Sequence, residues 1–241
     1  MSCKGKTGKA LERCMKSYVK SSKRKFPTFN KKKDTVITTS GKGSRSAVMR
    51  HNRMSAQKYN PPKLNSQKTS DFIKLSNPDL VIIFGCHLIK NPLLSVLPKH
   101  SINLHGGLSP KYRGTATMFW PFYFLEPNHV GTTFHYIVSE PDAGNVIHQS
   151  TPILEYGDKI HDVACKSIIQ SAKDVIKLIT IFKKNNKWDI FPQKSTGKNF
   201  LENDFRTEHL RVIYDLFNND IVDYFLDNKI KPKYPNLIKQ F

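Results

Sequence analysis

Three polar residues with complementary chemistry lie near the middle of the chain: Asn103, His105 and Asp142. An amide can donate a hydrogen bond to an oxygen that gains negative charge, and a histidine exchanges a proton near neutral pH. A carboxylate can accept a proton or hold a charge on a neighbouring histidine. Together these groups suit general acid–base catalysis, although turn Asn and Asp residues taken singly are more often structural.

The predicted elements bring these residues toward one edge of a sheet. Asn103 and His105 are two residues apart at the end of a predicted strand, residues 101–104, so their side chains point to the same face. Asp142 lies in the loop 139–144, which follows the next predicted strand. Because ligands of open α/β sheets gather at the C-terminal ends of strands, these polar residues are candidates for a site.

The strongest strand prediction is the unbroken apolar run LVIIF at residues 80–84, which is typical of a parallel strand buried on both faces. The expected strands are residues 34–39, 80–84, 101–104, 131–138, 145–148 and 153–154. The expected helices are residues 46–59, 66–75, 116–125 and 161–183, then 208–217 and 220–226 in the tail. Strands alternating with helices indicate an α/β fold with a largely parallel, Rossmann-like sheet and helices on both faces.

The net charge of +20 is concentrated at the start of the chain, where residues 1–50 hold 15 Lys or Arg and two Asp or Glu. Aromatic residues are sparse there (Tyr18, Phe26, Phe29), and no nucleic-acid-binding module is recognisable. This composition favours a basic, flexible and solvated segment over residues 1–33. The alternative is an arm that binds RNA or another polyanion, and it is the one part of the chain expected to contact nucleic acid.

The four cysteines, at positions 3, 14, 86 and 165, lie far apart and include no CxxC pair. This spacing argues against a zinc site and against a disulfide framework, so we expect no metal and a reducing compartment. The sequence has no run of about 18 apolar residues and no apolar segment of signal-peptide type. We therefore expect a cytoplasmic protein with no membrane partner.

Two segments resemble the folate-dependent formyltransferases: residues 101–114 (SINLHGGLSPKYRG) and 131–149 (GTTFHYIVSEPDAGNVIHQ). The family pattern is Asn-x-His, a small residue, Leu-x-Pro and Gly, followed some thirty residues later by Asp-x-Gly. This chain supplies it in order with Asn103, His105, Leu108, Pro110, Gly114, Asp142 and Gly144. Residues 77–89 (NPDLVIIFGCHLI) resemble the family's folate-binding stretch, and the likeness spans residues 34–182.

The resemblance implies N-formyl transfer from the co-substrate 10-formyltetrahydrofolate to a primary amine, with Asn103, His105 and Asp142 as the catalytic residues. Asn103 and His105 would stabilise the oxyanion, and His105 would protonate the leaving nitrogen. Asp142 would accept the proton of the amine or orient His105. The implied folate-binding residues are Phe84, Gly85, Cys86, His87, Leu88, Ile89, Ser139 and Glu140.

The chain departs from the family pattern ahead of Asp34, where the family's first strand and Gly-rich turn are not recognisable. We therefore expect this first strand to be missing or replaced. The expected organisation is a basic segment (residues 1–33), a formyltransferase catalytic domain (residues 34–195) and a helical C-terminal tail (residues 196–241).

The favoured acceptor is an amino sugar attached to a nucleotide. The motif of such enzymes often continues with Tyr-Arg-Gly and an aromatic-rich helix, as residues 112–114 and 119–122 do here. The alternatives are phosphoribosylglycinamide, whose enzymes use the Gly-rich turn, and methionyl-tRNA, whose enzymes carry a C-terminal β domain. A rival from another class is an inactive, formyltransferase-like protein that binds RNA or another polyanion. A homodimer is compatible with the sequence.

Overall fold

The apolar run LVIIF forms strand β2 (Leu80–Phe84), whose three central residues are buried. It pairs in parallel with β1 (Asp34–Thr38) on one side and with β3 (Ser101–His105) on the other. The computed structural model describes residues 34–38, 64–193 and 197–241 of the chain. A central parallel strand exposes neither face, which explains why its sequence lacks polar alternation.

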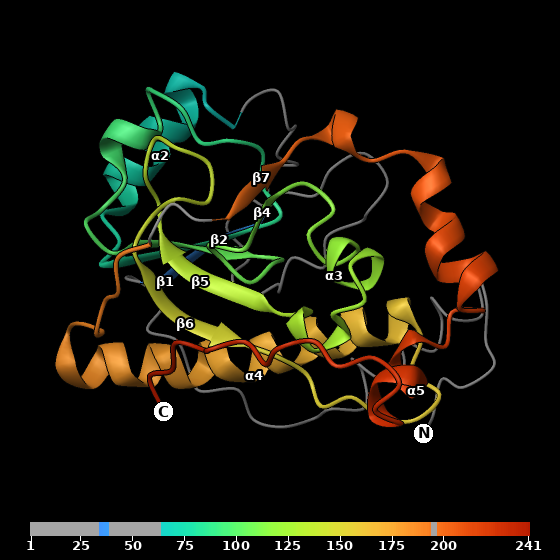
Figure 1. The fold of residues 1–241 in the computed structure, drawn as a ribbon. Helices are drawn as coiled ribbons and strands as arrows, with labels where there is room; N and C mark the ends of the chain where they lie inside the picture. Colours follow the sequence, from blue (N-terminus) through green and yellow to red (C-terminus); the bar gives the residue numbers. More distant parts are fainter. Residues whose placement is uncertain (1–33, 39–63, 194–196) are drawn as a thin grey trace, which may run out of the picture. The chain divides into compact units, whose positions relative to one another are not determined.

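The described strands form a five-stranded sheet in the order β1-β2-β3-β5-β6 (Figure 1). β5 (Thr132–Tyr136) is antiparallel to β3, and β6 (Val146–Ser150) is antiparallel to β5. A short loop joins β5 to β6, and a strand that returns through a short loop must run antiparallel. The predicted α/β sheet is therefore confirmed, with its parallel part confined to the first three described strands.

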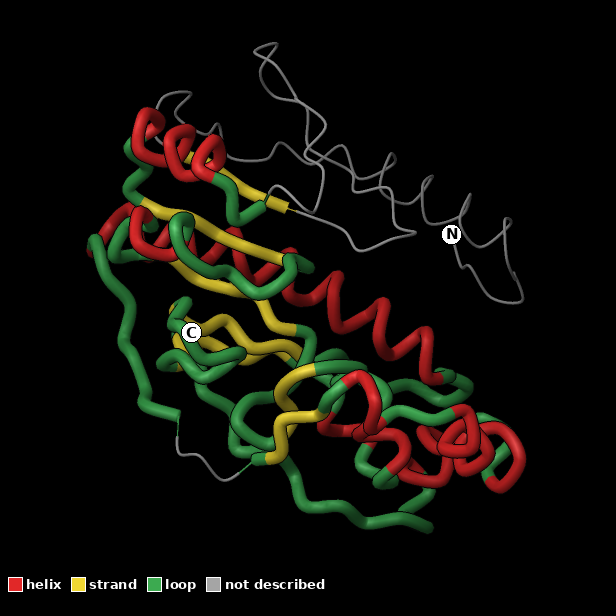
Figure 2. The backbone as a smooth tube through the Cα atoms, turned by 90° about the horizontal axis from the view of Figure 1, so that it is seen from above, coloured by secondary structure: helices red, strands yellow, loops and turns green. Residues whose placement is uncertain are grey.

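Helices cover both faces of this sheet, as expected (Figures 1 and 2). On one face, Ile73 of α2 (Gln67–Ser76) packs with Val81 and Ile83 of β2. On the other face, α4 (Ile160–Asn185) lies along β5 and β6, and its Ser171 hydroxyl is hydrogen-bonded to Thr132. The apolar periodicity of both segments thus predicted their positions to within two residues at each end.

The expected helix at residues 116–125 is wrong in its length, because α3 covers only Trp120–Tyr123. Ala116 and Leu125 adopt φ angles of 55° and 57°, and a right-handed α-helix cannot pass through that left-handed conformation. The expected strand at residues 153–154 is also wrong, since this segment forms no strand and the Ile153 side chain is 82% exposed.

The segment 197–241 packs back onto the preceding part of the chain. β7 (Lys198–Phe200) pairs in parallel with β4 (Tyr112–Gly114) in a small second sheet. The tail continues with a π-helical turn (Val212–Leu216) and α5 (Ile221–Leu226), so only the second expected tail helix is α-helical. The described chain also has short 3-10 turns at Leu94–Val96, Pro127–His129, Glu202–Asp204 and Thr207–His209.

Apolar side chains of the tail share one buried cluster with residues before and within α4. Its members are Phe122, Val130, Ile160, Val163, Ile213, Ile221 and Val222. The expected helix 46–59, the basic segment 1–33 and the question of the missing first strand lie outside the described residues. Among the described helices, none is both long and apolar enough to cross a membrane.

Candidate active site

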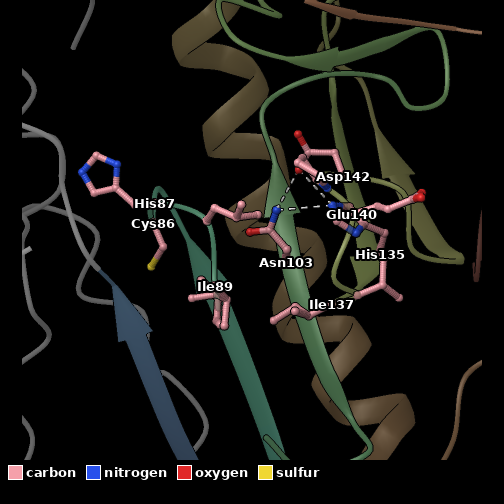
Figure 3. A pocket seen from close by; sticks show the side chains of 12 residues that line it. Cys86, His87, Ile89, Asn103, His135, Ile137, Glu140 and Asp142 are labelled. Carbon is pink, nitrogen blue, oxygen red and sulfur yellow. Dashed lines mark hydrogen bonds and ion pairs between the residues drawn. The ribbon is translucent and has the colours of Figure 1, made fainter. Parts of the chain in front are cut away.

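A cavity of about 170 Å³ opens where β2 and β3 end, beside the loop that follows β5 (Figure 3). Its lining consists of Ile83, Cys86, His87, Leu88, Ile89, Asn103, His135, Ile137, Val138, Glu140, Pro141 and Asp142. Apolar walls with a few polar groups are typical of sites for small organic ligands. The cavity thus lies at the strand ends where the sequence predicted a site.

Asn103 and Asp142 meet at the polar side of this cavity, as expected (Figure 3). The Asn103 Nδ2 amide donates to Asp142 Oδ1 over 3.3 Å. The register of the sheet places Asn103 opposite His135, whose Nε2 lies 3.3 Å from the same amide nitrogen. A hydrogen-bond donor and a carboxylate therefore face the same cavity.

His105 lies behind Asp142, with its side chain only 7% exposed. Its Nδ1 is 3.3 Å from Asp142 Oδ2, and its Nε2 is 3.0 Å from the carbonyl oxygen of Tyr112. Because a carbonyl can only accept, Nε2 carries a hydrogen. Burial lowers the pKa of His105, while the carboxylate of Asp142 opposes that effect. In the neutral ring Nδ1 is therefore unprotonated and can accept a proton from Asp142.

The backbone around Asp142 is held in an uncommon conformation. Asp142 itself has a φ angle of 50°. The Gln193 amide donates to the carbonyl oxygens of Asp142 (2.9 Å) and Gly144 (2.6 Å). A Cβ atom on Gly144 would lie 1.8 Å from the carbonyl oxygen of Tyr136, so only glycine fits there. The Asp-x-Gly spacing thus has a steric cause.

Two N–H donors and two histidine ring nitrogens surround the carboxylate of Asp142, whose side chain is 16% exposed. The Gly114 N–H donates to Oδ2 over 3.2 Å, and His135 Nε2 lies 3.4 Å from Oδ1. Burial by itself would raise the pKa of Asp142. The bond from His135, the charges of both histidines and the Gly114 N–H outweigh that effect and lower the pKa. Asp142 is therefore a carboxylate at neutral pH.

His135 also lines the cavity, and the sequence motif does not include it. It is buried, and its Nδ1 lies 2.9 Å from the carbonyl oxygen of Tyr136. The alternation of β5 does place Thr133 and His135 on one face, but only the pairing of β5 with β3 brings that face to Asn103.

The predicted folate-binding residues divide into two groups. Five of them line the cavity: Cys86, His87, Leu88, Ile89 and Glu140. Phe84, Gly85 and Ser139 flank these residues along the chain and lie outside the lining. Gly85 has a φ angle of 64°, which turns the chain sharply at the end of β2.

The arrangement can stabilise negative charge on an oxygen and take up a proton in the same cavity. The Asn103 amide can donate a hydrogen bond, and the Asp142 carboxylate can accept a proton, with His105 behind it. Within the described part of the chain, no group of three or more His, Cys, Asp or Glu residues is arranged to hold a metal ion.

Known proteins that are similar to this chain include formyltransferases. A family model described as "Formyl transferase" matches residues 9–175, more than half of the chain. The solved structures that are similar include the formyltransferase PseJ from Anoxybacillus kamchatkensis, in complex with UDP-4,6-dideoxy-4-formamido-L-AltNAc and tetrahydrofolate. That chain is 24% identical with a TM-score of 0.51, over 61% of this chain and 76% of its own.

Two further structures are similar at the same level. A 4-N formyltransferase from Francisella tularensis is 22% identical with a TM-score of 0.50, over 61% of this chain and 63% of its own. A sugar N-formyltransferase from Shewanella sp is 23% identical with a TM-score of 0.50, over 59% of this chain and 56% of its own. This chain thus spans less than two thirds of these last two proteins, and such identities show a shared fold.

Proposed function

This chain belongs to the formyl transferase family, and we propose that it moves a formyl group from 10-formyltetrahydrofolate to a primary amine. The observation that carries the proposal is the Asn103–Asp142 pair, a donor and a carboxylate 3.3 Å apart on the wall of one cavity. Formyl transfer needs both functions at the same carbon atom.

The proposed reaction forms one C–N bond and breaks another. The amine of the acceptor attacks the formyl carbon, and the Asn103 Nδ2 amide donates a hydrogen bond to the carbonyl oxygen as it becomes negative. Asp142 accepts the proton that the amine loses. His105 Nδ1, 3.3 Å from Asp142 Oδ2, shares that proton, which then passes to the departing nitrogen. No proton is gained or lost overall.

The cavity suits a folate ring by its lining. Ile83, Leu88 and Ile137 provide apolar walls, while Asn103, Glu140 and Asp142 provide polar groups. When bound, the folate supplies the activated formyl group. The chain's part is to hold the ring against the apolar walls so that the formyl carbon lies beside Asn103.

The proposed acceptor is an amino sugar attached to a nucleotide. Support comes from the Tyr112-Arg113-Gly114 motif and from the aromatic cluster beside it, in which Trp120 stacks on Phe200 at 4.6 Å between ring centroids. One similar solved structure is a sugar N-formyltransferase, and another contains a UDP-linked formamido sugar. Phosphoribosylglycinamide and methionyl-tRNA are the alternative acceptors.

The test is a transfer assay with the purified full chain, 10-formyltetrahydrofolate and a panel of amines that includes UDP- and dTDP-linked amino sugars, phosphoribosylglycinamide and methionyl-tRNA. Release of tetrahydrofolate and formation of the formamide, read by mass spectrometry, should occur with an amino-sugar nucleotide. Asp142→Asn should abolish most of the signal, and Asp71→Asn, which alters an exposed carboxylate on α2, should retain it.

The same assay separates the competing interpretations. Product from phosphoribosylglycinamide or methionyl-tRNA alone would reject the amino-sugar acceptor while keeping the chemistry. An absence of product with every amine, together with RNA binding that weakens steeply with salt, would instead support the inactive, polyanion-binding protein.

A further inference from the structure

Gln149 on β6 is a buried side chain that the reaction above does not use; it is 3% exposed. Its Nε2 donates to the carbonyl oxygen of Ser109 over 2.7 Å and lies 3.3 Å from Thr133 Oγ1. Its Oε1 accepts from the Ile238 N–H over 3.1 Å. A carbonyl can only accept and an N–H can only donate, so these partners define a single orientation of the amide.

Thr133 extends this hydrogen-bond network to the loop that directly follows His105. The Thr133 hydroxyl is fully buried, donates to the Gly107 carbonyl over 2.7 Å and accepts the Ser109 N–H over 2.9 Å. In the sheet, Thr133 pairs with His105 on one side and with Gln149 on the other. The backbone after His105 is therefore held by side chains from two neighbouring strands.

This loop returns to the ring of His105. The Tyr112 N–H donates to the Leu108 carbonyl over 2.9 Å, which closes the turn around Ser109. The Tyr112 carbonyl in turn receives His105 Nε2 over 3.0 Å. The position of the Ser109 carbonyl therefore affects the position of the Tyr112 carbonyl, which orients the His105 ring.

The far side of Gln149 is anchored to residues about ninety positions later in the chain. Besides the bond from Ile238 to its side chain, its own N–H donates to the Ile238 carbonyl over 2.8 Å. The Gln240 N–H donates to His148 Nδ1 over 3.1 Å. The segment around Ile238 therefore runs along β6 and fixes Gln149 from outside.

We propose that Gln149 is a positioning residue for formyl transfer: it holds the Ser109 carbonyl so that the loop 106–112 keeps His105 oriented toward Asp142. This inference rests on the proposed function for its effect on turnover. The orientation of the His105 ring is a separate consequence, and it can be measured without any reaction.

The first test is Gln149→Leu, which keeps a side chain of similar size and removes all three hydrogen bonds. A displacement of a catalytic group by about 1 Å can cost on the order of a hundredfold in rate. We expect kcat to fall by roughly 10- to 100-fold, with KM for both substrates within about twofold of the wild type. The matched control is Gln170→Leu on α4, whose amide donates to Asp174 and not to the loop; its kcat should not change.

The second test is Gln149→Glu, which has the same shape as glutamine. A carboxylate at this position would face the Ser109 carbonyl, whereas the protonated acid can donate to it as the amide does. The ratio of variant to wild-type kcat should therefore rise as the pH is lowered. This comparison uses one folded protein at several pH values, so it stands even if Gln149→Leu does not fold.

A third measurement reads the geometry directly. The ¹⁵N chemical shifts of the His105 ring, assigned by their loss in His105→Gln, should change in Gln149→Leu and stay unchanged in Gln170→Leu. Unchanged His105 shifts and a kcat within about twofold of the wild type would overturn the positioning role. A wild type that transfers no formyl group, with shifts that still respond to Gln149→Leu, would overturn the proposed function and leave the positioning link standing.

Discussion

Replacing Asp142 by asparagine preserves the size of the side chain but removes its charge and one of its two acceptor oxygens. Oδ1 receives the Asn103 amide, and Oδ2 receives the Gly114 N–H at 3.2 Å and lies 3.3 Å from His105 Nδ1. The new amide group must turn its NH₂ toward one of these two sets of donors. At least one hydrogen bond to a charged acceptor is lost. This loss should lower the free energy of unfolding by about 1.5–3 kcal/mol.

The effect of Asp142→Asn on turnover should be larger than its effect on stability. Loss of a general base lowers a rate by about 10²- to 10⁴-fold, which corresponds to roughly 3–5 kcal/mol in activation free energy. The assay is single-turnover release of tetrahydrofolate at saturating donor, and thermal melting measures the stability in parallel. Asp71→Asn serves as the matched control for charge removal.

Asp142→Asn could lose about 1.5–3 kcal/mol of unfolding free energy and still keep kcat within about fivefold of the wild type. That result would refute Asp142 as the base. The carboxylate would then only organise the loops.

Three other predictions follow from packing and titration. Tyr112→Phe removes the buried hydroxyl that donates to Glu126 over 2.5 Å, and should lower the free energy of unfolding in urea by about 1–3 kcal/mol. Ile213→Ala empties a fully buried position where the tail meets the domain, and should cost about 2–5 kcal/mol in the same experiment. Burial lowers the pKa of His105 in the folded chain, so the unfolded chain takes up a proton first as the pH falls below about 6.5. Wild-type stability should therefore fall from pH 7 toward pH 5, and this slope should be shallower in His105→Gln; equal slopes would contradict the assignment.

Local sequence patterns were sufficient for the elements whose signal is a regular repeat of apolar residues. The run LVIIF predicted β2 without error, and the helical spacing of apolar residues predicted α4 to within two residues. The helix at residues 116–125 was predicted too long, because its aromatic residues favour burial in any conformation. The left-handed φ angles at Ala116 and Leu125 are not marked by any repeat of apolar residues in the sequence.

By itself, the sequence determined the alternation of strands and helices, the shared face of Asn103 and His105, and the family motif that adds Asp142 to them. Each of these is a matter of spacing along one segment. Only the tertiary structure decided that His135 belongs to the site, that the His105 ring turns toward the Tyr112 carbonyl, and that Gln149 joins Ser109 to Ile238. The reason is physical: these contacts depend on the direction and register of strand pairing between distant segments, which the periodicity of a single segment does not contain.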